Sequence, residues 1–173
     1  MNEKLTKVLI IRHGEKPGDP AIDSDSDSRD LSSRGFERAK ALATFIPQTF
    51  GRPDFLFATH ASKHSDRPVE TITPLSQAIG IGIDDKHADD DFQNVADDIL
   101  SHPKYAGKLI LICWHHGKIP ELTGALGGNA PEDPWPGTVF DRVWSLEIPN
   151  PSDGQGIPVQ NIPQQLLPGD ATE

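Results

Sequence analysis

Short apolar runs and longer amphipathic stretches alternate along the chain. Residues 7–11 and 109–114 are apolar runs of strand length, which is typical of strands buried on both faces of a sheet. Residues 33–50 instead carry apolar side chains at intervals of three and four, the spacing of a helix with one buried face, and Ser32 or Ser33 is available as the N-cap. The N-terminal part therefore predicts a strand, a loop and a helix.

The rest of the chain continues this alternation. We expect further strands over residues 54–58, 81–83 and 140–148, an edge strand over 159–167 interrupted by Pro163, and helices over 68–79, 92–100 and about 119–126. Such a pattern predicts an α/β fold, a three-layer α/β/α sandwich with a mostly parallel central sheet. We expect a single domain over residues 1–173, with a core of about 5–148 and a C-terminal edge segment and tail over 149–173.

Basic side chains and histidines stand where the predicted strands end. Arg12 and His13 follow the first strand, His115 and His116 follow the strand over 109–114, and Arg67 stands at a predicted helix start. The carboxyl ends of parallel strands meet at one edge of a sheet, so we expect these side chains to converge. Guanidinium groups and a helix N-terminus bind phosphoryl oxygens, and histidine is a competent nucleophile near neutral pH.

Four motifs follow one another in this part of the chain. They are the triplet Arg12-His13-Gly14, the helix start over residues 31–39, Arg67 followed four residues later by Thr71, and His116-Gly117 after an apolar strand. In order and spacing they resemble the histidine phosphatase superfamily, which includes cofactor-dependent phosphoglycerate mutases and phosphohistidine phosphatases. The resemblance covers residues 7 to about 126.

The resemblance implies a role for each matching residue. His13 is expected to attack phosphorus, and Arg12 and Arg67 to hold the phosphoryl oxygens. The family pattern places glycine directly after the second histidine, which favours His116 over His115 as the donor to the transferring group. The further residues expected at the substrate or at the rim of its site are Gly14, His115 and Gly117.

The proton donor for the leaving group is open at this stage. One branch of the family carries an acid directly after the second histidine, where this chain has Gly117. The candidates are Glu15, near the nucleophile, and the run Asp89, Asp90 and Asp91 after the short third strand, within which we favour Asp90 and Asp91. A solvated acidic turn is an equal alternative for that run.

Composition and spacing limit the other classes of function. The net charge of −10 argues against nucleic-acid and anionic-membrane partners. His60 and His64 have the spacing of a metal-binding pair on a helix but no third ligand, so we expect rim histidines and neither a metal nor another cofactor. The single cysteine, Cys113, lies in an apolar run and predicts a buried thiol. The four-residue apolar stretch near the N-terminus is too short for a signal peptide, and we expect a cytoplasmic protein.

These observations favour a metal-independent phosphatase that works through a phosphohistidine on His13. Its substrate is expected to be a small phosphorylated metabolite or a phosphoprotein, with the small compound slightly favoured because the loop over residues 15–30 is acidic. The alternatives are a phosphate-binding module of the same fold without turnover and a phosphosugar-acid mutase. Mutases of this family are typically longer, so hydrolysis is the simpler expectation.

Overall fold

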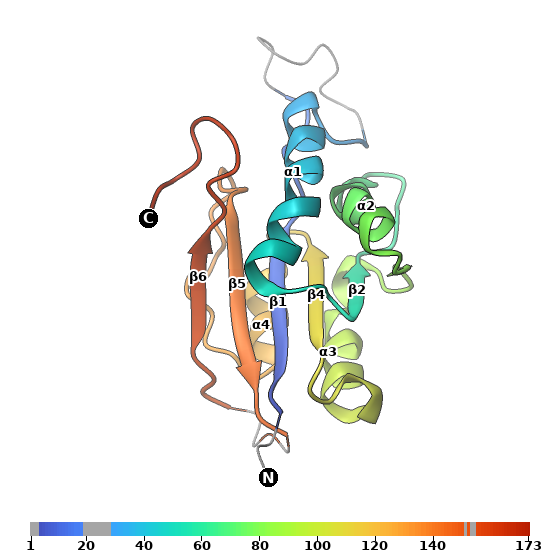
Figure 1. Cartoon of the computed structure of the whole chain (residues 1–173), viewed down its shortest axis with the longest axis vertical. Helices are drawn as coiled ribbons and strands as arrows, with labels where there is room; N and C mark the ends of the chain where they lie inside the picture. The colour runs from blue at the N-terminus through green and yellow to red at the C-terminus, as the bar shows by residue number, and fades with distance from the viewer. Residues whose placement is uncertain (1–3, 19–28, 151, 153–154) are drawn as a thin grey trace.

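A six-stranded sheet forms the middle of the molecule (Figure 1). The computed structural model describes residues 4–18, 29–150, 152 and 155–173, so the centre of the acidic loop over residues 15–30 lies outside the described residues. The strands are β1 (Thr6–Arg12), β2 (Phe55–Ala58), β3 (Ile83–Asp84), β4 (Leu109–Trp114), β5 (Arg142–Ile148) and β6 (Val159–Pro163), in the spatial order β3-β2-β4-β1-β5-β6.

The sheet is parallel from β3 to β1 and antiparallel from β1 to β6. This confirms the mostly parallel sheet predicted from the sequence. β1 lies between β4 and β5, with Arg12 opposite Trp114 in the parallel β1–β4 pair. The strands β1, β2 and β4 therefore end at the same edge of the sheet, and the segments that follow them meet there.

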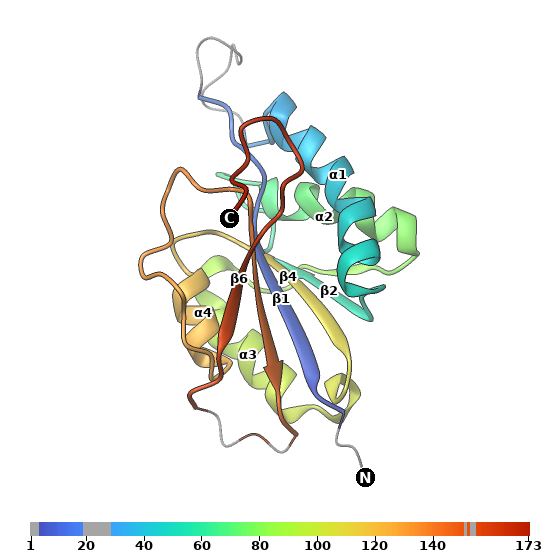
Figure 2. The same cartoon turned by 60° about the vertical axis from the view of Figure 1, so that its left-hand side comes forward.

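Helices cover both faces of the sheet, which confirms the three-layer architecture (Figure 2). Helices α1 (Ser33–Phe50) and α2 (Arg67–Ile79) lie on one face, and α3 (Phe92–Ser101) and α4 (Ile119–Ala125) on the other. Successive side chains of a strand point to opposite faces, so Leu9 and Ile11 of β1 pack towards α1 and α2, while Val8 and Ile10 pack towards α3 and α4. All four side chains are fully buried.

Local sequence sets several of the element ends. Ser32 is the N-cap of α1, because its hydroxyl accepts a hydrogen bond from the Gly35 N–H at 3.1 Å. Gly80 ends α2 in the left-handed conformation, with φ of 70°. Both were expected from the sequence.

The predicted strand over residues 140–148 is too long at its start. β5 begins at Arg142, and Phe140 lies before the strand with its ring stacked on the Arg12 guanidinium. At the far edge, β6 ends at Pro163, opposite Arg142. A proline is tolerated there because an edge strand leaves one side of its backbone unpaired.

The buried groups agree with the sequence. Trp114, Trp135 and Trp144 are all core side chains, and Cys113 is a fully buried free thiol whose pKa is raised by burial. Among the described residues, no helix has both the length and the apolar character needed to cross a membrane. The expectation of a single domain stays a prediction.

Candidate active site

His13 is the first residue after β1 and is buried, with 2% of its surface exposed. Its Nδ1 lies 2.7 Å from the carbonyl oxygen of Gly14. A carbonyl oxygen only accepts hydrogen bonds, so Nδ1 carries the proton and donates it, and Nε2 keeps an unprotonated lone pair. Burial and, to a smaller extent, the charge of Arg12 lower the pKa of His13 to about 2, although the bond to Gly14 opposes them. The ring is therefore a neutral imidazole at neutral pH, with the character of a nucleophile.

A short chain of hydrogen bonds joins the end of β1 to the start of α2. The Gly14 N–H donates to the Thr71 hydroxyl at 2.8 Å, and that hydroxyl donates to the carbonyl oxygen of Arg67 at 2.7 Å. Thr71 is the threonine four residues after the second arginine in the motif read from the sequence. Thr71 therefore links the backbone that follows His13 to the backbone of Arg67.

Arg12 is almost fully buried, with 1% of its surface exposed. Its Nη1 donates to the carbonyl oxygens of Gly137 at 2.8 Å and Val139 at 3.0 Å, whereas its buried Nε has no hydrogen-bond partner among the described residues. Burial and the nearby charge of Arg67 lower the pKa of Arg12 to about 10, and the charge of Glu15 opposes them. Two guanidinium groups whose charges interact in one cavity favour binding of an anion there.

The structure places His115, the first residue after β4, against His13. The two ring centroids are 5.2 Å apart in an edge-to-face arrangement. The reason is register: Arg12 pairs with Trp114, so the residues that follow them, His13 and His115, are level at the sheet edge. His116 also lines the cavity but lies one residue further, in the turn before α4. Both histidines line the cavity, and the preference for His116, which rested on the glycine after it, stays a prediction.

These side chains line a cavity of about 380 Å³ at the carboxyl end of the sheet. The cavity brings together residues from four segments of the chain: Arg12, His13, Lys16, Ser62, His64, Ser65, Arg67, Asp89, His115, His116 and Gly117. Asp89 is the one acid among these lining residues. The expected convergence of Arg12, His13, Arg67 and the histidines after β4 is found in the structure.

Asp89 has the environment of a proton donor. Its Oδ1 is buried without a hydrogen-bond partner in the described part of the chain. Burial raises the pKa of Asp89 to about 6, with a further contribution from the negative charge of Asp90, while Lys118 opposes the shift. Its backbone is held in place, because the Trp114 indole N–H donates to the Asp89 carbonyl oxygen at 3.1 Å.

The three acids favoured from the sequence lie elsewhere. Asp90 points outward, with 90% of its side chain exposed and an ion pair to Lys118 at 3.6 Å. The Asp91 carboxylate accepts from His87, which lowers the Asp91 pKa. The Glu15 carboxylate forms ion pairs with Arg34 and Arg38. The three consecutive aspartates form a 3₁₀ turn, and only the phase of that turn decides which side chain faces the cavity.

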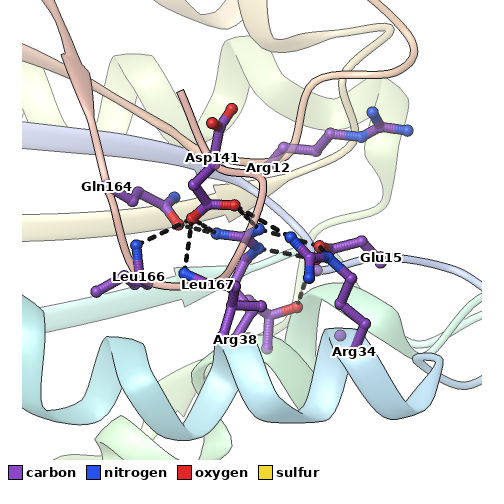
Figure 3. A network of polar contacts seen from close by, with 12 residues as sticks. Arg12, Glu15, Arg34, Arg38, Asp141, Gln164, Leu166 and Leu167 are labelled. Carbon is purple, nitrogen blue, oxygen red and sulfur yellow. Dashed lines mark hydrogen bonds and ion pairs between the residues drawn. The ribbon is translucent and has the colours of Figure 1, made fainter. Parts of the chain in front are cut away.

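Glu15 belongs to a buried network of ion pairs beside the cavity (Figure 3). Its carboxylate accepts from Arg34 at 2.8 Å and from Arg38 at 2.8 and 3.0 Å. Arg38 also binds the carboxylate of Asp170 in the C-terminal segment at 2.7 Å. Although burial tends to raise the Glu15 pKa, the bonds to Arg38 lower it overall, so Glu15 is an ionised structural partner. In Figure 3 the guanidinium of Arg12 points away from this network.

The rim histidines do not form a metal centre in the described residues. His60 Nδ1 lies 3.0 Å from the Asp85 carbonyl oxygen, and His64 lines the cavity. Within the same described residues, one group of three side chains could share a metal ion. It consists of the carboxylates of Asp30, Asp66 and Glu70, the last two at the start of α2. Acidic groups of this kind are common without an ion.

Comparison with known proteins finds similar solved structures. No protein-family model matches the sequence, and no curated protein matches it. A mycobacterial glucosyl-3-phosphoglycerate phosphatase superposes with a TM-score of 0.58 at 15% identity, covering 94% of this chain and 100% of that one. The protein histidine phosphatase SixA, solved with tungstate, has a TM-score of 0.58 at 14% identity, covering 90% and 94%. A protein described as mycobacterial hydrolase 1 has a TM-score of 0.59 at 15% identity, covering 91% and 96%. At such identities the likeness shows a shared fold.

Proposed function

We propose that this chain, which has the fold of the histidine phosphatase superfamily, is itself a phosphatase that hydrolyses phosphomonoesters through a phosphohistidine on His13. The observation that carries the proposal is the state of His13: a buried neutral imidazole, protonated on Nδ1 by its bond to Gly14, in a cavity with two arginines. A neutral ring with a free Nε2 is what attack on phosphorus requires.

The first step forms the phosphohistidine. The Nε2 lone pair of His13 attacks phosphorus, and the bond from phosphorus to the ester oxygen breaks. Arg12 and Arg67 bind the equatorial oxygens, and His115 donates to them as charge builds. The departing oxygen takes a proton from Asp89, whose raised pKa of about 6 keeps a share of the carboxyl protonated near neutral pH.

The second step returns the enzyme to its starting state. The Asp89 carboxylate accepts a proton from a water molecule, the water oxygen attacks phosphorus, and the phosphorus–nitrogen bond breaks. Inorganic phosphate leaves, His13 is again a neutral imidazole, and Asp89 is again protonated. No group other than the residues named and water takes part in this balance.

The substrate class that suits the cavity best is a small phosphorylated compound. A volume of about 380 Å³ matches a metabolite-sized ligand, and the cationic lining suits its phosphoryl group. Among proteins of this fold, one neighbour is named for a phosphorylated sugar acid and another for protein phosphohistidine. A phosphoprotein is therefore the second candidate substrate.

Phosphate release from p-nitrophenyl phosphate tests the proposal, with a chelator present. His13→Ala should abolish turnover, by at least about a thousandfold. His102→Ala, which removes an exposed histidine at the other end of the molecule, should leave turnover unchanged. Rapid acid-free quenching followed by intact-mass measurement should show one phosphoryl group on the wild type and none on His13→Ala.

Three outcomes would redirect the proposal. Full activity in His13→Ala would exclude the histidine nucleophile. Binding of phosphate without release from any aryl phosphate would identify a binding module, and transfer between two positions of one substrate without free phosphate would identify a mutase.

A further inference from the structure

The segment over residues 135–140 lies outside the motifs that resemble the family, yet it contacts the first phosphate-binding arginine directly. It connects α4 to β5 and places two backbone carbonyl oxygens, those of Gly137 and Val139, on Nη1 of Arg12 at 2.8 and 3.0 Å. The Trp135 indole N–H donates to the same Val139 oxygen at 2.9 Å. This carbonyl is therefore fixed from two sides, by a buried tryptophan and by the arginine.

These bonds decide which edge of the Arg12 guanidinium is left for a ligand. Nη1 is occupied by the two carbonyl oxygens. Neither Nε nor Nη2 has a hydrogen-bond partner among the described residues, and Nε is buried. A phosphoryl group binds a guanidinium through two neighbouring N–H groups. The edge formed by Nε and Nη2 is therefore the one whose N–H groups have no partner among the described residues.

Phe140 supports the same guanidinium from its face. The Arg12 Cζ lies 3.8 Å from the centroid of the Phe140 ring, and the same ring lies 6.1 Å from the His13 ring. Stacking of this kind restricts rotation of a planar cation about its last side-chain bonds. The two carbonyl bonds to Nη1 and the Phe140 ring together hold the guanidinium of Arg12 in one orientation.

We propose that Phe140 is a positioning residue that holds Arg12 so that its Nε–Nη2 edge faces the phosphoryl group in the cavity. The inference rests on the proposed phosphoryl site and adds to it a residue of the α4–β5 segment. Phe140 itself is outside the lining of the cavity, so its effect passes through Arg12.

Equilibrium binding of orthovanadate, measured by calorimetry, tests the inference without depending on turnover. Phe140→Leu keeps an apolar side chain but removes the ring, and should weaken vanadate binding about tenfold. Phe140→Tyr keeps the ring and should bind within about twofold of the wild type. Phe45→Leu, which removes a ring from an aromatic pair on the α1 side at 5.9 Å, is the matched control and should leave vanadate affinity unchanged.

A second background separates positioning from general damage. In Arg12→Lys the planar group is absent, so adding Phe140→Leu should cost less than about twofold in vanadate affinity. Equal losses in both backgrounds, or wild-type affinity in Phe140→Leu, would overturn the inference while leaving the phosphatase proposal intact. A wild type that binds no vanadate would overturn the proposed function itself, and the inference with it.

Discussion

Two titratable side chains in one cavity are held in complementary states. Burial keeps the His13 imidazole unprotonated, with a pKa lowered to about 2, and keeps the Asp89 carboxyl protonated to higher pH, with a pKa raised to about 6. In each case burial disfavours the charged form, because that form loses its hydration. In the proposed mechanism the same cause thus makes one residue a nucleophile and the other an acid.

Replacing Asp89 should lower the rate with substrates that have poor leaving groups more than the rate with substrates that have good ones. Because Asp89 donates only while protonated, the rate with phenyl phosphate should fall as pH rises through about 6. Asp89→Asn should remove this dependence and lower that rate about a hundredfold, whereas 2,4-dinitrophenyl phosphate, whose leaving group needs no proton, should lose little. Pre-steady-state burst rates from pH 4 to about 9, which report the first step alone, measure this. Asp90→Asn is the control, and a loss in it equal to that of Asp89→Asn would contradict the assignment.

The two adjacent histidines should differ strongly. His115→Asn removes the ring that contacts His13 and should lower kcat about a hundredfold, as expected for a donor to the transferring group. His116→Asn, at the outer part of the cavity, should cost less than about fivefold. Single-turnover rates with p-nitrophenyl phosphate measure the difference, and the opposite ranking would restore His116 to the role that the sequence favoured.

The sequence predicted which types of side chain form the site better than which of two or three neighbouring residues takes a given role. Arg12, His13 and Arg67 follow from the rule that strand ends and helix starts meet at one edge of a parallel sheet. The choice between His115 and His116 depends on strand register, which local sequence does not show, and the pairing of Arg12 with Trp114 is the observation that favours His115. Asp89 was undecided because three identical side chains in a row carry no pattern.

At the scale of elements, the start of α1 packs closely against the segment that follows β1. A Cβ on Gly35 would lie 2.4 Å from the Glu15 carbonyl oxygen and 3.0 Å from the Glu15 N. The Glu15 carbonyl also accepts from the Ser32 N–H at 2.9 Å. Helix and loop therefore touch backbone to backbone, two residues beyond His13.

Gly35→Ala should damage both stability and activity. The added methyl must push the loop away, at a cost of about 1 to 3 kcal/mol in the free energy of unfolding, and should lower kcat by moving His13. Gly124→Ala is the matched control, since that helical glycine faces open space; it should be neutral or stabilise by up to about 1 kcal/mol. Urea denaturation with activity assays compares the two, and equal effects would mean that the close approach has no consequence.

Elements were predicted well where hydrophobic pattern decides them and less well where tertiary contacts do. The runs that became β1 and β4 and the amphipathic stretch of α1 were located to within a residue. The start of β5 was predicted two residues early, because the sequence shows an apolar Phe140 but not the arginine on which it stacks. The antiparallel pairing of β5 with β1 on one side and with β6 on the other leaves no mark in the local sequence pattern.

At the scale of the whole molecule, the C-terminal segment is tied to the active-site end of α1. The Asp170 carboxylate accepts from Arg38, and from the N–H groups of Leu166 and Leu167 at 3.0 and 3.1 Å. Burial tends to raise the Asp170 pKa, but the bonds to Arg38 and to the two N–H groups lower it to about 2. The last residues of the chain thus support the ion pair that holds Glu15.

This tie predicts a loss of stability in acid. The folded-state pKa of Asp170 is below its ordinary value of 3.8, so its contribution is present above about pH 4 and is lost as pH falls towards 2. Asp170→Asn should lower the free energy of unfolding at pH 7 by about 2 kcal/mol and flatten the pH dependence in that window. Asp97→Asn, an exposed carboxyl on α3, is the control for thermal and urea unfolding. An unchanged acid slope in Asp170→Asn would contradict the prediction.

The position of β1 in the sheet also has a consequence for how the chain is made. β1 is synthesised first, but both of its neighbours, β4 and β5, come far later, and the bond from the Gly107 N–H to the Thr6 hydroxyl spans 101 residues. A nascent chain therefore carries the apolar run of β1 unpaired until β4 and β5 have left the ribosome. Contacts this distant in sequence close slowly. His13 is translated long before His115 and the segment over residues 135–140, so the cavity around it is assembled only after β4 and β5 have been synthesised.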